Sequence, residues 1–179
     1  SPLTPEWRRE KEIIKNATLF ADIMQIIYEM SGKSDPYFTS VNRIASTSVA
    51  ITLMLTYPRL HNGKQPTPEN LEYIINDFSR IRKYYDELVK IDKNNTFIAI
   101  RDTIKSEFLG EGREKFQDHC RGLRIQLNNF LLDPEIKRIL CSQDTIDLDR
   151  ALSNGEVTVV NIELGDLGAV NSPAFGLFF

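Results

Sequence analysis

The 179-residue chain contains few of the residues that disulfides and metal sites require. It has two cysteines and two histidines, and two cysteines cannot form the disulfide network that stabilises small secreted domains. Cys120 and Cys141 both fall on apolar faces of predicted helices, which favours free, buried thiols and a reducing compartment. With only His61 and His119 to assist the thiols, we expect no metal site.

The chain also lacks a large charge excess and a long apolar run. Its net charge is −3, so no global positive field draws it to nucleic acid or anionic lipid. The most apolar predicted helix, near Val41–Leu55, is shorter than a membrane span and carries Arg43. The charge is uneven, however. Residues 80–140 carry 13 Lys and Arg against 10 Asp and Glu, whereas residues 141–179 carry 1 against 6.

Sequence signatures of catalysis are missing as well. No GxxxxGK[ST] phosphate loop is present, and no apolar strand ends in Asp-Glu. The turn Gly165-Asp166-Leu167-Gly168 has few glycines for a nucleotide loop, and no Lys follows it. No Ser/His/Asp or Cys/His arrangement can be argued from position. We therefore expect neither catalysis nor a bound cofactor from this part of the protein.

What the sequence does contain is a series of helix signals between residues 4 and 152. Each of several predicted helices starts with a capping residue, a Pro and usually an acid, a pattern that suits the first helical turn. The predicted helices cover about 4–30, 37–57, 68–91, 97–109, 113–132, 134–141 and 147–152. We expect Pro58 to stop the second helix, which is apolar around most of its circumference and is predicted to be the central one. The third helix either breaks near Arg82 or continues to Ile91.

A single buried strand is predicted after the helices. Val157–Leu164 is rich in β-branched residues and almost continuously apolar, which is typical of a strand covered on both faces. A lone strand cannot satisfy its own backbone hydrogen bonds. The predicted fold is therefore an all-α multi-helix bundle with one residual β-strand from an adjoining domain, and we expect the chain to be part of a larger protein.

One predicted helix face carries the candidate binding residues. At 100° per residue, five polar side chains of the helix 113–132 lie within roughly 80° of one another. These are Arg113, Gln117, Arg121, Arg124 and Asn128. Guanidinium groups match phosphate oxygens, so this face is a candidate for contact with DNA or with an acidic protein segment.

Simpler interpretations of these residues remain open. The arginines can instead pair with Glu111, Glu114 or Asp118 on a solvated face. Arg59 and Lys64, in the predicted loop after the second helix, are further candidates with the same ambiguity. Tyr37 and Phe38 are interpreted as core residues rather than as base-stacking residues.

Several segments, taken in their serial order, resemble one family. They are DPYFTSVNRIASTSVAITLML, YPRLHNGKQPTPENLEYIINDF, GLRIQLNNFLLDPEIKRILC, IDLDRALSNGEVTVVNIELGDLG and SPAFGLFF. Together they are similar to the TraG-like ATPases, the coupling proteins that deliver DNA and relaxase to the conjugative type IV secretion channel. The resemblance spans nearly the whole chain, but none of its pieces is a catalytic motif.

The resemblance implies a domain organisation and a function. In this family an all-α domain is inserted into a RecA-like motor, so residues 4–152 correspond to the all-α domain and residues 153–179 to the segment that returns to the motor sheet. The all-α domain recognises substrates, meaning relaxosome proteins and the DNA they carry. ATP and Mg²⁺ would be bound by the parent motor, which is expected to be a hexamer at the cytoplasmic face of the bacterial inner membrane. The isolated chain is expected to be monomeric.

Two alternatives belong to different functional classes. The chain could be the helical part of a VirB-type secretion ATPase that positions subunits for hydrolysis. It could also be a helical scaffold that binds no ligand of its own and only packs against neighbouring subunits.

Overall fold

The protein is an all-α, multi-helix fold in a computed structural model that describes residues 5–30, 32, 35–143, 150, 153–155 and 176. Its elements in chain order are α1 (Pro5–Met30), α2 (Pro36–Leu60), α3 (Pro68–Asn76), the 3₁₀ turn η1 (Phe78–Ile81), α4 (Arg82–Ile91), α5 (Ile98–Thr103), the π-helical turn η2 (Ile104–Phe108), α6 (Arg113–His119), α7 (Arg121–Leu131) and α8 (Pro134–Leu140). The predicted strand Val157–Leu164 and most of the predicted helix 147–152 lie outside the described residues.

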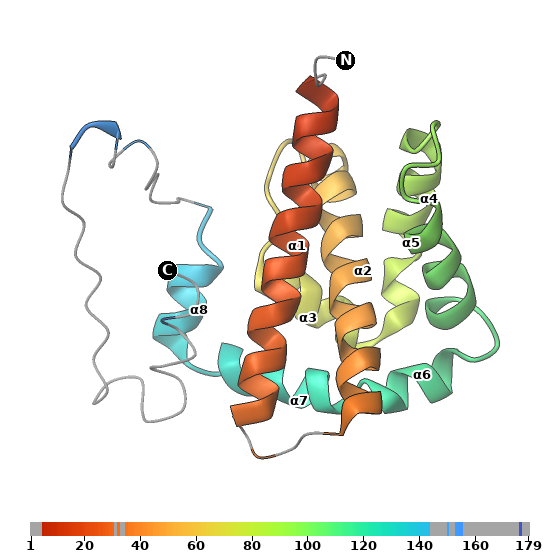
Figure 1. Ribbon diagram of the computed structural model, residues 1–179, viewed down its shortest axis with the longest axis vertical. Helices are drawn as coiled ribbons and strands as arrows, with labels where there is room; N and C mark the ends of the chain where they lie inside the picture. Colours follow the sequence, from red (N-terminus) through yellow and green to blue (C-terminus); the bar gives the residue numbers. More distant parts are fainter. Residues whose placement is uncertain are drawn as a thin grey trace.

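Helix α2 is the central element, as its composition predicts. It runs antiparallel to α1 and is also packed against α3, α4, α6 and α7 (Figure 1). Small residues on its buried face allow this close approach, among them Ala45, Ser46, Ser48, Ala50 and Thr52. The hydroxyl of Thr52 donates to the Ser48 carbonyl at 2.7 Å, and Thr56 donates to Thr52 in the same way. The buried hydroxyls therefore add no unsatisfied polar groups to the core.

The boundaries of α2 correct two predictions. Pro58 does not stop the helix, which continues to Leu60. A Pro in the last turn removes only one amide donor, and its fixed φ is compatible with helix. Ile44, one of the apolar residues of this helix, is 46% exposed. The helix is therefore central without being enclosed on every side.

An aromatic cluster joins the second half of the bundle. Phe78 of η1, Phe108 of η2 and Phe116 of α6 have ring centroids 4.3 to 5.6 Å apart, and all three are buried. Each such pair contributes about 0.5–1.5 kcal/mol beyond its buried area. The chain turns sharply after η2, where a Cβ on Gly110 would lie 2.3 Å from the Ser106 carbonyl oxygen. Only glycine fits at this turn.

The predicted continuous helix 113–132 is wrong. The chain breaks into α6 and α7 at Cys120, whose ψ of 8° leaves the helical range. Tyr28 of α1 packs against the first turn of α7, and a Cβ on Gly122 would lie 2.8 Å from its ring. In Figure 1, α7 passes across the lower part of the α1–α2 pair, and α6 lies to the side of α2. The break lets α7 contact both α1 and α2, while α6 contacts α2.

The sequence left open whether residues 68–91 form one helix, and the structure has the break: α3 ends at Asn76 and α4 begins at Arg82. The prediction that both cysteines are free is confirmed, but the prediction that both are buried holds only for Cys120, since Cys141 is half-buried. Burial raises the pKa of the Cys120 thiol to about 12, which makes it a packing group rather than a nucleophile. Within the described part of the chain, no helix is both long enough and apolar enough to cross a bilayer.

Gln117 connects α6 to the junction between α3 and η1. Its side-chain nitrogen donates to the Asn76 carbonyl at 2.9 Å, and its oxygen accepts from the Phe78 amide at 3.3 Å. Both backbone groups lie where regular helical bonding is interrupted. A side chain from a distant element thus replaces two missing main-chain bonds.

We predict that Gln117→Ala lowers the free energy of unfolding by about 2 kcal/mol, because it leaves a part-buried donor and acceptor without partners. Urea denaturation measures the change. Lys115→Ala, on an exposed position of the same helix, is the control and is expected to change stability by less than about 0.5 kcal/mol. Equal stability of the two variants would contradict a structural role for Gln117.

Candidate functional site

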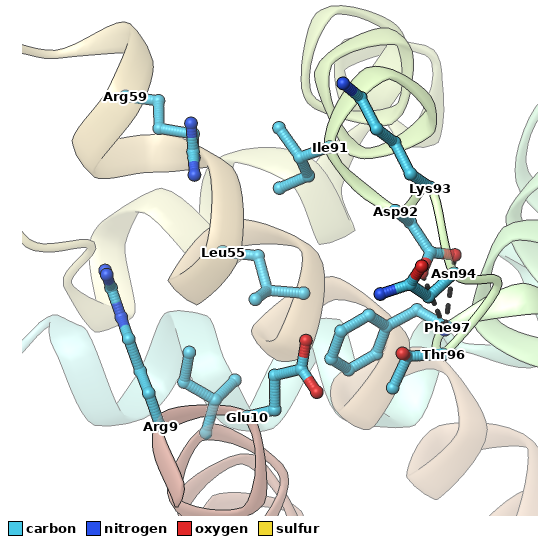
Figure 2. A pocket seen from close by; sticks show the side chains of 11 residues that line it. Arg9, Glu10, Leu55, Arg59, Ile91, Asp92, Lys93, Asn94, Thr96 and Phe97 are labelled. Carbon is cyan, nitrogen blue, oxygen red and sulfur yellow. Dashed lines mark hydrogen bonds between the residues drawn. The ribbon is translucent and has the colours of Figure 1, made fainter. Parts of the chain in front are cut away.

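A cavity with a polar rim lies where the start of α1, the end of α2 and the α4–α5 loop meet. Its volume is about 100 Å³. The floor is apolar, and the rim is polar and mainly cationic (Figure 2). We call it the basic pocket; it is lined by Arg9, Glu10, Ile13, Leu55, Arg59, Ile91, Asp92, Lys93, Asn94, Thr96 and Phe97.

Helices α1 and α2 each carry an arginine at the pocket, four residues from an apolar residue that also lines it. Arg9 precedes Ile13 by four residues, and Arg59 follows Leu55 by four, so each arginine extends the inward face of its helix by one turn. Because the helices are antiparallel, these two positions meet at one end of the bundle. Figure 2 shows Arg9 and Arg59 on neighbouring helices at one side of the pocket. The cation at Arg59 also lies in the last turn of α2, where it favourably opposes the helix dipole.

The opposite side of the pocket is a loop held by a buried ion pair. The Asp92 carboxylate accepts from the Phe97 amide at 3.2 Å and from Arg101 Nη1 at 3.2 Å, and its side chain is only 2% exposed. Arg101 also donates to the Asn95 side chain at 3.0 Å, and Asn95 has a left-handed φ of 57°. These bonds hold in place the loop that carries Lys93, Asn94 and Thr96 to the rim.

The electrostatic balance of the pocket is positive. Among the described residues, the side chains of Arg9, Arg59 and Lys93 form no ion pair. The charge of Asp92 is already neutralised by Arg101, which leaves Glu10 as the one acid on the rim that has no cationic partner in the described structure. Three cations against one free carboxylate favour an anionic ligand such as a phosphate.

The positive surface continues past the end of α2. His61 caps this helix, its ring is stacked on Tyr57 with centroids 3.9 Å apart, and its Nε2 lies 3.3 Å from the Tyr84 hydroxyl. Burial first, and then the charges of Lys83 and Lys64, lower the pKa of His61. The contacts of His61 with Tyr57 and Tyr84 hold the last turn of α2, which carries Arg59, against α4. Lys64 and Lys83 add positive charge around His61.

The structure separates the predicted polar stripe into different environments. Gln117 has the bridging role described above. With its nitrogen toward Glu72, the Asn128 amide donates to that carboxylate at 2.9 Å, so it links α7 to α3.

The three arginines of the stripe also differ in their surroundings. Arg113 is half-buried. The pKa of the Asp77 carboxyl is lowered mainly by the hydrogen bond from the Ser79 hydroxyl, and the charge of Arg113 makes a smaller contribution in the same direction. Arg124 is half-buried on α7, and Arg121 is exposed beyond the break.

Of the two loop candidates, one lies in the basic pocket. Arg59 lines it, although on a helix rather than in a loop, whereas Lys64 is an exposed residue of the following turn. Sequence reasoning missed Arg9 and Lys93. Arg9 could have been predicted, because it lies one helical turn before Ile13, at the end of the apolar stripe of α1. No local sequence pattern indicates that Lys93 lies at the same site.

The placement of Tyr37 and Phe38 corrects another prediction. They are 56% and 36% exposed rather than buried in the core. They lie at the first turn of α2, where Asp35 caps the helix by accepting from the Tyr37 amide at 2.8 Å. This turn projects past the core toward His119, whose Nδ1 is 3.0 Å from the Tyr37 hydroxyl.

No family model, no curated protein and no solved structure matches this chain. Within the described ranges, no group of three or more His, Cys, Asp or Glu side chains is arranged to hold a metal ion.

We predict that Asp92→Ala lowers the free energy of unfolding by about 3 kcal/mol, because removing one partner of a buried ion pair leaves the other charge uncompensated. Urea denaturation at neutral pH measures this loss. Asp102→Ala, on the exposed side of α5, is the matched control, with an expected change below about 0.5 kcal/mol. A loss at Asp92 no larger than at Asp102 would show that the loop does not depend on the pair.

We also predict a pH-dependent contribution from His61. Since its pKa is lowered in the folded state, the folded chain binds fewer protons than the unfolded chain just below the ordinary value of 6.5. Its stabilising contribution is therefore present above pH 6.5 and is lost as the pH falls toward the folded pKa. Urea denaturation at pH 7.5 and 5.5 should show a smaller loss of stability for His61→Gln than for the unmodified chain. An identical loss in both proteins would contradict the assignment.

Proposed function

We propose that this chain is the substrate-recognition all-α domain of a conjugative type IV secretion coupling ATPase, and that the basic pocket contacts the DNA that is transferred. The observation that supports the proposal is the convergence of Arg9, Arg59 and Lys93, from three separate parts of the chain, around one cavity. Cations placed together without carboxylate partners are the common means of binding a phosphate backbone. The serial resemblance to TraG-like ATPases supplies the biological context.

The size of the cationic area limits the kind of binding expected. Three pocket cations with Lys64 and Lys83 nearby form a small footprint, and binding that rests on phosphate contacts is independent of base sequence. We therefore infer that the domain holds the DNA backbone without reading its sequence. Selection of the correct DNA then rests with relaxosome proteins that the same domain recognises.

In this proposal the rest of the parent protein performs the ATP chemistry. Residues 153–179 would return to a RecA-like motor sheet through the predicted strand, and ATP and Mg²⁺ would be bound by motor residues outside this chain. The parent would be a hexamer at the cytoplasmic face of the bacterial inner membrane. The chain itself would contribute binding and no catalytic residue.

The binding test uses fluorescence anisotropy with a labelled 20-nucleotide oligo-dT and a 20-base-pair duplex, in 50 to 200 mM salt. Affinity is expected to fall as salt rises, with a slope of log K against log salt of about −0.7 for each phosphate contact of single-stranded DNA and about −0.9 for duplex. Neutralising two of the contacts, in Arg9→Ala/Arg59→Ala, should make the slope shallower by about 1.4 for single-stranded DNA. Because both side chains are exposed, folding should be unaffected.

The matched control is Arg138→Ala, which removes an exposed cation of α8 that does not line the pocket. It should retain the affinity and slope of the unmodified chain. Equal effects of the pocket and control variants would show that DNA does not use the basic pocket. No binding of either DNA at 50 mM salt would favour a scaffold that packs only against neighbouring subunits.

A second experiment separates recognition from motor assembly. In a full-length ATPase containing this chain, Arg9→Ala/Arg59→Ala is expected to reduce DNA transfer and leave ATP hydrolysis unchanged. A parallel loss of hydrolysis would instead favour the helical part of a VirB-type ATPase, in which the helices position subunits.

A further inference from the structure

A small cavity lies between α1, α2 and α7, away from the basic pocket. Its volume is about 10 Å³, which is room for about one water molecule and for no larger ligand. We call it the three-helix cavity. It is lined by Ala21, Met24, Gln25 and Tyr28 of α1, by Thr39, Asn42 and Arg43 of α2, and by Leu123 of α7.

The side chain of Asn42 is the group in this cavity that requires a partner. Asn42 is only 8% exposed, and neither its side-chain oxygen nor its side-chain nitrogen has a hydrogen-bond partner among the described residues. Leaving a buried amide in this state is strongly unfavourable. Buried polar side chains in folded proteins are therefore almost always bonded, either to protein or to ordered water.

The surrounding helices are packed too closely to offer Asn42 another route to solvent. A Cβ built on Gly122 of α7 would lie 3.5 Å from Asn42 Nδ2 and 2.8 Å from the Tyr28 ring of α1. The three helices thus meet at this point, and Gly122 allows the contact because it has no side chain. The amide of Asn42 remains inside the interface that this contact forms.

Other polar groups of the cavity can complete the coordination of a water molecule. Arg43 donates to the Asp22 carboxylate and, at 3.5 Å, to Gln25 Oε1. An amide oxygen accepts two hydrogen bonds, so Gln25 Oε1 can accept one more. The Thr39 hydroxyl lies one turn before Asn42 on the same helix and lines the same cavity. A buried water molecule typically makes about three hydrogen bonds, and this cavity offers that number.

The chemistry of the amide selects water over an ion. Asn42 Nδ2 must donate and Oδ1 must accept, so a metal cation would satisfy only the oxygen and an anion only the nitrogen. The positive charge of Arg43 is already balanced by Asp22, so the cavity has no excess charge that would hold an ion of either sign. Water donates and accepts, is neutral, and matches the volume.

We propose that the three-helix cavity is a binding site for one buried water molecule, which bonds to Asn42 of α2 and to Gln25 of α1, with Thr39 as its third partner. The water would join α1 to α2 beside the contact with α7. This proposal does not depend on the conjugative function or on the basic pocket, so either can fail alone.

A high-resolution crystal structure of the full chain tests the proposal directly. We expect one ordered solvent peak within about 2.7–3.2 Å of the Asn42 side chain and of Gln25 Oε1. In solution, the side-chain NH₂ of Asn42 should show cross peaks to the water resonance with NOE and ROE of opposite sign, as for a long-lived bound water. Because a hydroxyl proton can relay such a signal, the measurement is repeated in Thr39→Val, where the cross peak should persist.

Two matched variants locate the water. Asn42→Leu keeps a side chain of similar size but removes both hydrogen-bonding atoms, so the solvent peak should be lost while the packing of the three helices is retained. Asn129→Leu makes the same change at an exposed position of α7 that does not line the cavity. It should leave the solvent peak and the water cross peak of Asn42 unchanged.

Three outcomes would overturn the proposal. The first is a direct hydrogen bond from the Asn42 amide to a protein group, with no solvent peak in the cavity. The second is a peak whose distances to oxygen ligands are below about 2.6 Å, which would identify a cation instead of water. The third is the absence of both the peak and the cross peak, which would leave Asn42 as an unsatisfied buried amide.

Discussion

The structure depends on the burial of α2. This helix packs against α1, α3, α4, α6 and α7, and small or hydroxyl-bearing residues at several of its inward positions, among them Ala45, Ala50, Thr52 and Thr56, allow the close approach. Thr52 and Thr56 return their protons to carbonyls one turn earlier at 2.7 Å. A larger or unsatisfied polar side chain at these positions would force the neighbouring helices apart or leave a buried group without a partner.

The two ends of α2 extend past the core and form two chemically different surfaces. At its C-terminal end Arg59 meets Arg9, because α1 is antiparallel to α2, and Lys93 is added by a loop that the Asp92–Arg101 pair holds rigid. At its N-terminal end Tyr37 and Phe38 meet His119 at the break between α6 and α7. The C-terminal end of α2 therefore presents a cationic surface, and its N-terminal end presents an aromatic one.

Local patterns predicted the helices well where an N-terminal cap and an apolar stripe agreed. Asp133 accepts from the amides of Glu135 and Ile136, and α8 begins where its Asp-Pro-Glu signal predicts. Local patterns were misleading where a distant contact decided the outcome. The local signal for a break near Cys120 is weak, since it is the single Gly122; the break accompanies the packing of Tyr28 on Gly122. Because the helix breaks, the five polar residues do not form one continuous stripe. Gln117 bridges α6 to the α3–η1 junction, Asn128 links α7 to α3, and Arg121 is exposed.

The sequence by itself determined that the described chain is helical and which helix is central, because capping, periodicity and residue size act within a few residues. It also singled out Arg59 and Arg121 as candidates. Only the tertiary structure decided that Arg59 lies with Arg9 and Lys93, and that Arg121 lies with Phe38 and Ile125. These groupings join side chains from different helices, and the packing of α1 and α6–α7 around α2 sets which of them meet.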